Sequence, residues 1–243
     1  MRMPARMRIP GLQAPSERGG NSSRRKETLA MFNPDSRQIT FIKRIVFLAS
    51  LLPLARLVAY GFTDRLGANP IEFITRSTGD WTLYFLCLTL AVTPLRRISN
   101  WNWLIKLRRM LGLFAFFYAV LHFTTFLWFD HFFEIDEMLK DVVKRPFILV
   151  GFIAFVLLIP LAATSTNGMI RRLGGKRWQW LHRLIYLIGP LGILHYWWMK
   201  AGKNDFEQPI LFGAIMGVLL LTRVYWNVLK PRMQKRRTKP APV

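Results

Sequence analysis

The amino-acid sequence predicts an all-α integral membrane protein in which six transmembrane helices form one bundle. Three observations support this prediction. First, 52% of the 243 residues are hydrophobic although the formal net charge is +22, a combination that is unusual for a soluble domain of this size. Second, apolar stretches of roughly bilayer length recur along the chain. Third, the loops between these stretches alternate between basic and acidic.

Residues 1–38 are expected to form a disordered, basic N-terminal extension in the cytoplasm. They combine arginines with Pro, Gly, Ser and Asn and contain almost nothing apolar to bury. We expect no signal peptide, because the first apolar run is too long and no small-residue cleavage site follows it. A later methionine, Met31, precedes the apolar part of the chain and is an alternative start.

Residues 39–229 are expected to form the transmembrane domain. Its apolar segments are 41–60, 81–95, 110–129, 147–163, 179–199 and 209–227. A span needs about 20 residues, so the second segment would need the preceding Thr78 to Trp81, or the region of Pro94, to complete it. Residues 230–243 are a basic cytoplasmic tail. This tail is too short for a dinucleotide-binding fold and the sequence has no GxGxxG motif, so hydride chemistry would need another protein.

The charges of the loops predict the orientation of the spans. Loops after the second and fourth spans contain Arg and Lys without any acid, and cations also flank the first and sixth spans. The other loops hold the acids Asp64, Glu72, Asp80, Asp130, Glu134, Asp136, Glu137, Asp141, Asp205 and Glu207. The positive-inside rule therefore places both termini in the cytoplasm. Because the cations lie between apolar spans, no nucleic-acid partner is expected.

Three histidines inside the predicted spans are the candidate functional residues, since imidazole in a bilayer is costly unless it finds a partner. His122 lies in the third span, and His182 and His195 lie in the fifth. By helix rise, the depths of His122 and His195 differ by only about 4–5 Å, so one planar cofactor could take an axial nitrogen from each. His182 lies roughly 20 Å from His195 along a straight helix, towards the cytoplasmic side.

Haem fits these histidines better than zinc does. No Cys, Asp or Glu lies nearby within the spans to complete a tetrahedral zinc site, whereas haem needs one or two imidazoles and an apolar slot. Each histidine could instead be a hydrogen-bonded packing residue. His182 and His195 point about 140° apart on an ideal helix, and a kink at Pro190 could restore a common facing. The fourth histidine, His131, follows the third span among loop acids and is expected to be solvated.

Arginines near the cytoplasmic ends of the spans are candidate anion ligands. Arg108 and Arg109 open the third span. Guanidinium groups bind carboxylates in a bidentate manner, and haem propionates are carboxylates, so this pair could hold propionates or other anions. Snorkelling towards the cytoplasm is the alternative and needs no ligand. Arg56 and Arg223 lie in the bodies of the first and sixth spans and are expected to face the bundle interior.

Four stretches of the sequence resemble the MsrQ (YedZ) family. They are residues 69–97, 107–122, 145–187 and 191–198, and the block from TSTNG to WLHRL is the most specific part. The likeness covers about residues 31–230. It implies a six-helix b-type cytochrome with the architecture of the ferric reductase-like transmembrane superfamily. It also implies that His122, His182 and His195 are haem ligands, with Arg108 or Arg109 at the cytoplasmic position where the wider superfamily has a fourth histidine.

The resemblance further implies a function in electron transfer. Electrons from the quinol pool or a cytosolic flavin reductase would cross the bacterial inner membrane to a periplasmic molybdopterin-containing subunit, which reduces methionine sulfoxide in oxidised proteins. The implied cofactors are one or two haem b groups and FMN, and this chain would not be the catalytic subunit. One alternative is a ferric reductase or NADPH oxidase-like haem membrane reductase that works with a separate flavoprotein. A transporter with a histidine proton relay is another, but it predicts inverted repeats and midplane carboxylates, and neither is seen.

Overall fold

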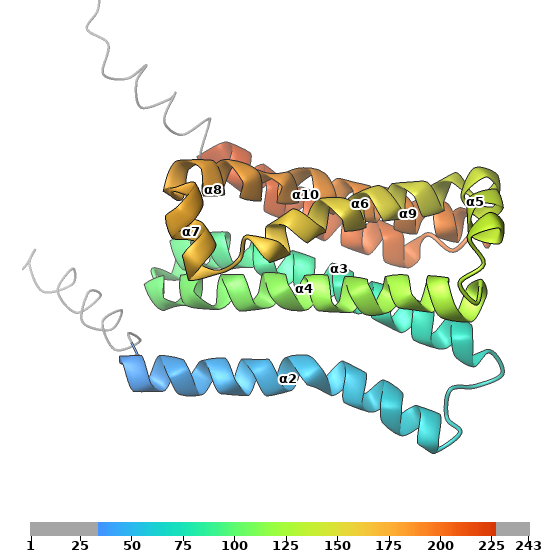
Figure 1. Cartoon of the computed structure of the whole chain (residues 1–243). Coiled ribbons are helices and arrows are strands. Elements are labelled where there is room, and N and C mark those ends of the chain that lie inside the picture. Colours follow the sequence, from blue (N-terminus) through green and yellow to red (C-terminus); the bar gives the residue numbers. More distant parts are fainter. Residues whose placement is uncertain (1–33, 227–243) are drawn as a thin grey trace, which may run out of the picture.

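The computed structural model describes residues 34–226, which form helices joined by short loops, with no β-strand among them. Figure 1 shows the long helices lying side by side along one direction. The all-α prediction is therefore confirmed for the described residues. The predictions for residues 1–33, including the start at Met31, and for the tail at 230–243 lie outside them.

Helix α2 (Ser36–Phe62) begins at a capping box, in which the Asp35 carboxylate accepts from the Gln38 amide and the Gln38 side chain accepts from the Asp35 amide. This helix lies chiefly beside α4 (Figure 1), and near its end the ring centroid of Tyr60 lies 6.2 Å from that of Phe73 in the next helix. The Tyr118 hydroxyl of α4 joins that helix to α2 by donating to the Ser50 carbonyl at 2.7 Å. Helix α2 is thus attached to one side of the bundle.

Helices α3 (Pro70–Ser99) and α4 (Ile105–Thr125) form an antiparallel hairpin that contains most of the core. A 3-10 turn, η1 (Asn102–Leu104), leads into α4, and a π-helical turn, η2 (Phe126–Asp130), continues it. The ring of Tyr118 is fully buried and stacks on Phe85 at a centroid distance of 5.4 Å. Large aromatic side chains thus fix the distance between α3 and α4.

The second half of the chain packs on this hairpin. It contains α5 (Ile135–Lys144), α6 (Pro146–Ala163), α7 (Asn167–Leu173), α8 (Gly175–Leu181), the 3-10 turn η3 (His182–Leu184), α9 (Ile185–Ala201) and α10 (Glu207–Val224). Helix α9 packs against α6 and α10, and α10 also packs against α3. The regular helix of the fifth predicted span is interrupted at η3, whereas α9 runs through Pro190.

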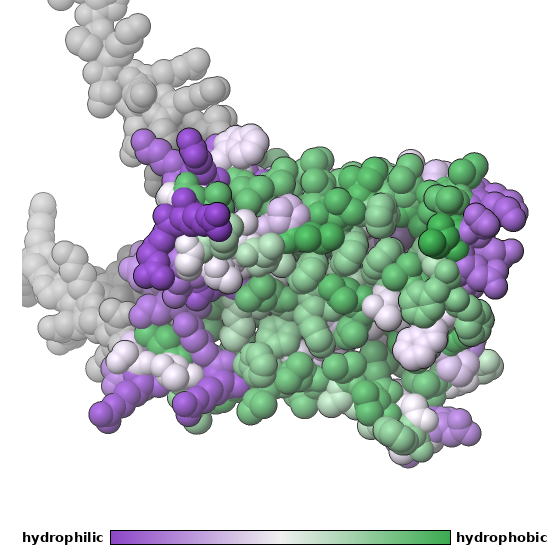
Figure 2. Space-filling model, in the orientation of Figure 1, coloured by the Kyte–Doolittle hydropathy of each residue, from purple (hydrophilic) through white to green (hydrophobic). Residues whose placement is uncertain are grey.

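Four segments are long and apolar enough to cross a bilayer: α2, the continuous stretch Asn102–Asp130, α6 and α10. Figure 2 shows an apolar belt between two polar ends. The protein is therefore a multi-pass membrane protein. Helices α3 and α9 lie alongside these spans (Figure 1), but α9 has only 17 residues because η3 precedes it.

The two polar ends of the bundle differ in charge. We call one the acidic end, because it holds the loops with Asp64, Glu72, Asp130, Glu134, Asp136, Glu137, Asp141, Asp205 and Glu207. The other is the basic end, with Arg96, Arg97, Lys106, Arg108, Arg109, Arg171, Arg172, Lys176 and Arg177. Helix α5, a short amphipathic helix at the acidic end, was not predicted from the sequence. Its apolar residues Ile135, Leu139 and Val143 are exposed along one face.

Candidate functional site

His122 and His195 come together inside the bundle near the acidic end. His122 lies in α4 and His195 in α9, and their ring centroids are 6.1 Å apart with the planes at 78°. A metal–imidazole bond is about 2 Å long, so two imidazoles on opposite sides of one metal have ring centroids about 6 Å apart. The spacing of the two rings fits a shared metal centre.

Backbone carbonyl groups orient both imidazoles. The Nδ1 atom of His122 lies 2.9 Å from the Thr75 carbonyl oxygen, and Nδ1 of His195 lies 2.7 Å from that of Phe147. A carbonyl oxygen can only accept, so each Nδ1 carries the proton and donates it. Each Nε2 therefore keeps a free lone pair. Histidines that bind metals almost always donate their other ring N–H in this way.

Glycines in α3 and α6 make room for the two rings. A Cβ atom at Gly79 would lie 3.1 Å from Cε1 of His122, and one at Gly151 would lie 2.6 Å from Nδ1 of His195. Gly79 follows Thr75 by one helical turn, and Gly151 follows Phe147 by one turn. Both histidines therefore reach a helix backbone beside a residue without a side chain.

His182 lies elsewhere, at the junction of α8 and η3 near the basic end. Its Nε2 atom is 3.1 Å from Oγ1 of Thr164, and its ring lies on Trp178 at a centroid distance of 3.9 Å. The Thr164 hydroxyl donates its proton to the Pro160 carbonyl at 2.6 Å, so its oxygen accepts from Nε2–H of His182. The structure thus does not bring His182 to the His122–His195 pair, and its Nε2 is already engaged.

The two candidate arginines at the start of α4 have different surroundings. Arg108 is partly buried and lies close enough to Arg223, Tyr186 and His182 to interact with them electrostatically. Arg109 is exposed and donates to the side-chain oxygen of Asn167 in α7. Of this pair, only Arg108 lies beside a candidate histidine.

The two arginines expected to face the interior also differ from each other. Arg223 is 6% exposed, so its prediction is confirmed. Arg56 is exposed and lies over the ring of Tyr60 at 5.7 Å, so its prediction was wrong. Arg56 faces outward because α2 contacts the bundle chiefly through α4, which leaves most of its surface uncovered.

His131 is not solvated, contrary to the prediction. Its side chain is 9% exposed, lies 3.3 Å from the Asp141 carboxylate and packs against Phe126 at a centroid distance of 4.7 Å. Helix α5 carries Asp141 back towards the end of α4, and the sequence analysis did not foresee this helix. Arg145 donates to the same carboxylate at 2.8 Å.

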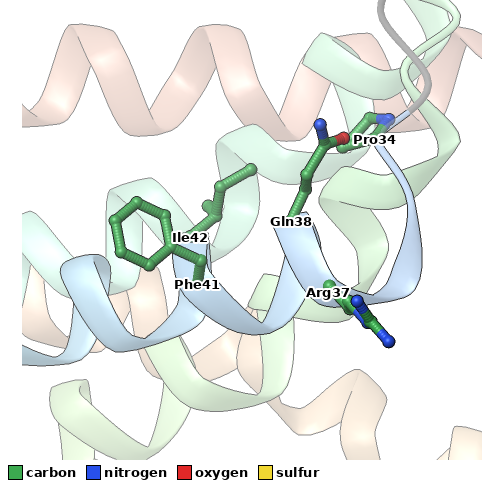
Figure 3. A pocket seen from close by; sticks show the side chains of 5 residues that line it. All are labelled: Pro34, Arg37, Gln38, Phe41 and Ile42. Carbon is green, nitrogen blue, oxygen red and sulfur yellow. The ribbon is translucent and has the colours of Figure 1, made fainter.

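A metal site formed by several side chains would be an alternative in the described part of the chain. No group of three or more His, Cys, Asp or Glu side chains there could hold a metal ion, and Cys87 is buried and free. A shallow pocket of about 500 Å³ lies at the start of α2 (Figure 3), lined by Pro34, Arg37, Gln38, Phe41 and Ile42. No histidine lines this pocket, so it is not the candidate site.

Sequence reasoning missed the parts of the site that are not side-chain ligands. These parts are the carbonyl groups of Thr75 and Phe147 and the glycines at positions 79 and 151. A signal was available, because glycine is costly inside a helix and its presence in α6 indicates close packing. The sequence could not show which histidine each glycine would meet.

The helical bundle with its histidine pair belongs to a class of protein, the ferric reductase-like membrane proteins. Residues 78–193 match the family model described as "Ferric reductase like transmembrane component". This stretch contains Gly79, His122, Gly151 and His182, and ends just before His195.

Curated relatives identify the family more closely. A protein of Herminiimonas arsenicoxydans is 77% identical over 195 residues, covering 80% of this chain and 89% of the relative. A protein of Ralstonia nicotianae is 61% identical over 78% of this chain and 88% of its own length. A third, from Azospira oryzae, is 48% identical over 86% of this chain and 90% of its own. All three are named protein-methionine-sulfoxide reductase heme-binding subunit MsrQ, and the chain belongs to the MsrQ family.

Proposed function

We propose that this chain is a transmembrane b-type cytochrome of the bacterial inner membrane. It transfers electrons from a quinol or a cytosolic flavin reductase to a periplasmic, molybdopterin-containing methionine sulfoxide reductase subunit. The names of the relatives support haem binding and the link to sulfoxide reduction. The observation that carries the proposal is the half-buried His122–His195 pair, in which both Nδ1 atoms are hydrogen-bonded to the backbone and both Nε2 atoms keep a free lone pair.

The donor set and its surroundings fit a haem. His122 and His195 would hold the iron through Nε2, and bound haem would supply one-electron transfer at this position. The hydrogen bonds to the Thr75 and Phe147 carbonyls fix the ring orientations and raise the basicity of the ligand nitrogens. The glycine contacts hold each ring against its helix.

The basic end is proposed as the side where electrons enter. His182 is proposed as a ligand of a second haem or as part of a flavin site. Ligation through its Nε2 requires release of the bond to Thr164. Arg108 and Arg109 are proposed to bind cofactor anions, with Arg108 better placed because it lies beside His182. FMN remains a proposed cofactor that rests on family resemblance.

We also propose that α3 and α9 complete a set of six spans with both termini in the cytoplasm. The apolar belt in Figure 2 runs between the acidic and the basic end. Placing the basic end in the cytoplasm satisfies the positive-inside rule. Electrons would then move from the basic end, near His182, towards the acidic end, near the His122–His195 pair.

A second candidate function is ferric reduction with a separate flavoprotein, favoured by the match to the ferric reductase-like family model. The two functions share the haem site and differ in the electron acceptor. An acceptor assay separates them, because the proposed function predicts that reduced protein is reoxidised by the periplasmic sulfoxide reductase and only slowly by ferric chelates.

The direct experiment is an absorption spectrum of detergent-purified protein, oxidised and then reduced. The proposal predicts bound haem with the spectrum of two histidine ligands in both states. Reoxidation is then followed after adding either the purified sulfoxide reductase subunit or a ferric chelate. Protein that binds no haem, or that is reoxidised only by the chelate, would contradict the proposed function.

A further inference from the structure

Arg223, near the end of α10, is buried in an unusual way. Its side chain is 6% exposed, so it does not snorkel to water. One terminal nitrogen donates to the Tyr186 hydroxyl at 2.7 Å, and the other donates to the Leu90 carbonyl at 2.8 Å and to Thr93 at 3.2 Å. All of these acceptors are neutral. The Nε atom is buried without a hydrogen-bond partner among the described residues.

A second guanidinium lies beside it. Arg108 of α4 is close enough to Arg223 to repel it, and it also approaches Tyr186 and His182. Arg108 makes no hydrogen bond or ion pair within residues 34–226, and Arg223 has no carboxylate partner there. Two like charges in a partly buried position are unfavourable unless an opposite charge compensates them.

None of the acids in residues 34–226 is placed to supply that charge. Of the acidic residues that the structure describes, only Asp35 belongs to the basic end, and its carboxylate caps α2. Asp80, inside α3, is close to Tyr196 and Lys200 near the acidic end. The sequence that follows Val224 contains no Asp or Glu. No compensating anion is thus found among the described residues, and a bound molecule would supply it.

We propose that Arg108 of α4 and Arg223 of α10 form an oxyanion-binding site, with Tyr186 of α9 as its neutral member. Guanidinium groups bind carboxylates and phosphates through paired N–H donors. The unpartnered Nε of Arg223 and the free guanidinium of Arg108 supply such donors. Because the site rests on the proposed function, two sources of the oxyanion are considered: a haem propionate and the phosphate of FMN.

The experiment uses purified full-length protein, its Arg108→Gln and Arg223→Gln variants, and Arg171→Gln as a matched control. Arg171 is an exposed cation of α7 at the same basic end and is not part of the proposed site. Binding of FMN is compared with binding of riboflavin, which lacks the phosphate. Reconstitution with haem b is compared with its dimethyl ester, which lacks the propionate charges. Flavin fluorescence and haem absorbance report binding without any assay of electron transfer.

We expect wild-type protein and Arg171→Gln to prefer one charged probe over its uncharged counterpart by about tenfold or more. Arg108→Gln and Arg223→Gln should lose that preference while binding the uncharged probe as before. A preference for FMN identifies the phosphate as the ligand, and a preference for haem b identifies the propionate.

Equal binding of charged and uncharged probes by wild-type protein would overturn the site, as would a preference that both variants retain. If Arg223→Gln does not fold, Arg108→Gln decides the matter, because it breaks no hydrogen bond in the described structure. The flavin comparison does not depend on haem. Failure of the proposed function would appear separately, as absence of haem from wild-type protein with either form of the cofactor.

Discussion

Gly151 and His195 are in such close contact that a single methyl group would separate them. A Cβ atom at position 151 would lie 2.6 Å from Nδ1 of His195, and that Nδ1 donates to the carbonyl of Phe147, one helical turn earlier in α6. In α3, a Cβ atom at Gly79 would likewise come close to the His122 ring, whose Nδ1 donates to the Thr75 carbonyl one turn earlier. Each imidazole is thus placed by a carbonyl and by the glycine one turn after it.

Replacement of these glycines by alanine should weaken haem binding without unfolding the protein. Gly151→Ala forces His195 away from the Phe147 carbonyl, because the added Cβ comes closer than atoms can pack. We expect a loss of haem affinity of about tenfold or more, the range seen when the outer-shell partners of metal ligands are changed. Gly79→Ala should cause a smaller loss, because its Cβ would lie 3.1 Å from the His122 ring. Haem titration of each variant measures both effects.

Gly217→Ala is the matched control for this pair. Gly217 lies in α10, and a Cβ there meets nothing within 4 Å. Alanine favours helix by about 1 kcal/mol over glycine, so none of the three variants should lose helical structure through propensity. Normal haem affinity in Gly151→Ala would contradict the proposed packing of His195 against α6.

The pairing of His122 with His195 could be predicted from the sequence, but the role of the glycines could not. The depth of a residue follows from helix rise and loop charge, which placed both histidines near one membrane face. Which helix a ring touches depends on how each helix is rotated about its axis. Helices α4 and α9 are apolar on all sides and have no clear polar face. Their rotation about the helix axis could therefore not be predicted from the sequence.

His182 tests whether the basic end holds a cofactor. Replacement by Ala should leave dithionite reduction of the His122–His195 haem intact and block reduction by the physiological donor, because a cofactor is missing from the relay. Thr164→Val is informative beside it, since it removes the oxygen that accepts from Nε2 of His182. It should keep donor-driven reduction, because Nε2 becomes free to bind a cofactor. Haem-to-protein stoichiometry and reduction by each donor are measured for both.

Two outcomes would contradict a role for His182 in electron transfer. One is a stoichiometry of one haem with normal donor-driven reduction in His182→Ala. The other is loss of donor-driven reduction in Thr164→Val. That loss would mean that His182 acts through its hydrogen bond to Thr164, and hence through packing.

The fifth predicted span shows a further limit of the sequence. Proline breaks the hydrogen-bond ladder of a helix, so a kink at Pro190 could give His182 and His195 a common facing. The regular helix is also interrupted at His182–Leu184, which the sequence did not predict, and α9 continues through Pro190. The bond from His182 to Thr164 and the bond from the Trp178 indole to the Thr164 carbonyl tie this turn to the end of α6. Such long-range bonds have no local signature in the sequence.

Cysteine labelling tests the proposed six spans. Cys87 is the only cysteine in the chain, so Cys87→Ala gives a background without reactive thiols. Single cysteines at the exposed positions Asp136 and Asn204 should react with a membrane-impermeant maleimide added from the periplasmic side. Cysteines at Lys106 and Arg171 should react only after the membrane is opened. Periplasmic labelling of Lys106 or Arg171 would contradict cytoplasmic placement of the basic end.

Glu72, in the first turn of α3 before its apolar stretch, joins that helix to the α9–α10 loop. It accepts from Lys203 at 2.8 Å and pairs with Arg76. The hydrogen bond from Lys203, together with the two nearby cations, lowers the pKa of the Glu72 carboxyl. Its contribution to stability is therefore present above the unfolded-state pKa of about 4.3 and is lost as the pH falls through the folded-state pKa.

The effect should be small, because exposed ion pairs are screened by water and salt. Thermal unfolding in detergent should show a slightly lower midpoint for Glu72→Gln at pH 7 and low salt. The difference from wild-type protein should vanish at low pH or at high salt. A difference that persists at pH 3 would show that the side chain acts through packing and not through its charge.

We propose that His122 and His195 hold one haem between α4 and α9, and this claim can be tested directly. The most direct measurement is haem content and absorption spectrum of His122→Ala and His195→Ala, with His131→Ala as the control histidine near the same end. The claim predicts that each of the first two variants loses most of its haem or its bis-histidine spectrum, whereas His131→Ala keeps both. Full haem occupancy with an unchanged spectrum in His122→Ala and His195→Ala would contradict it.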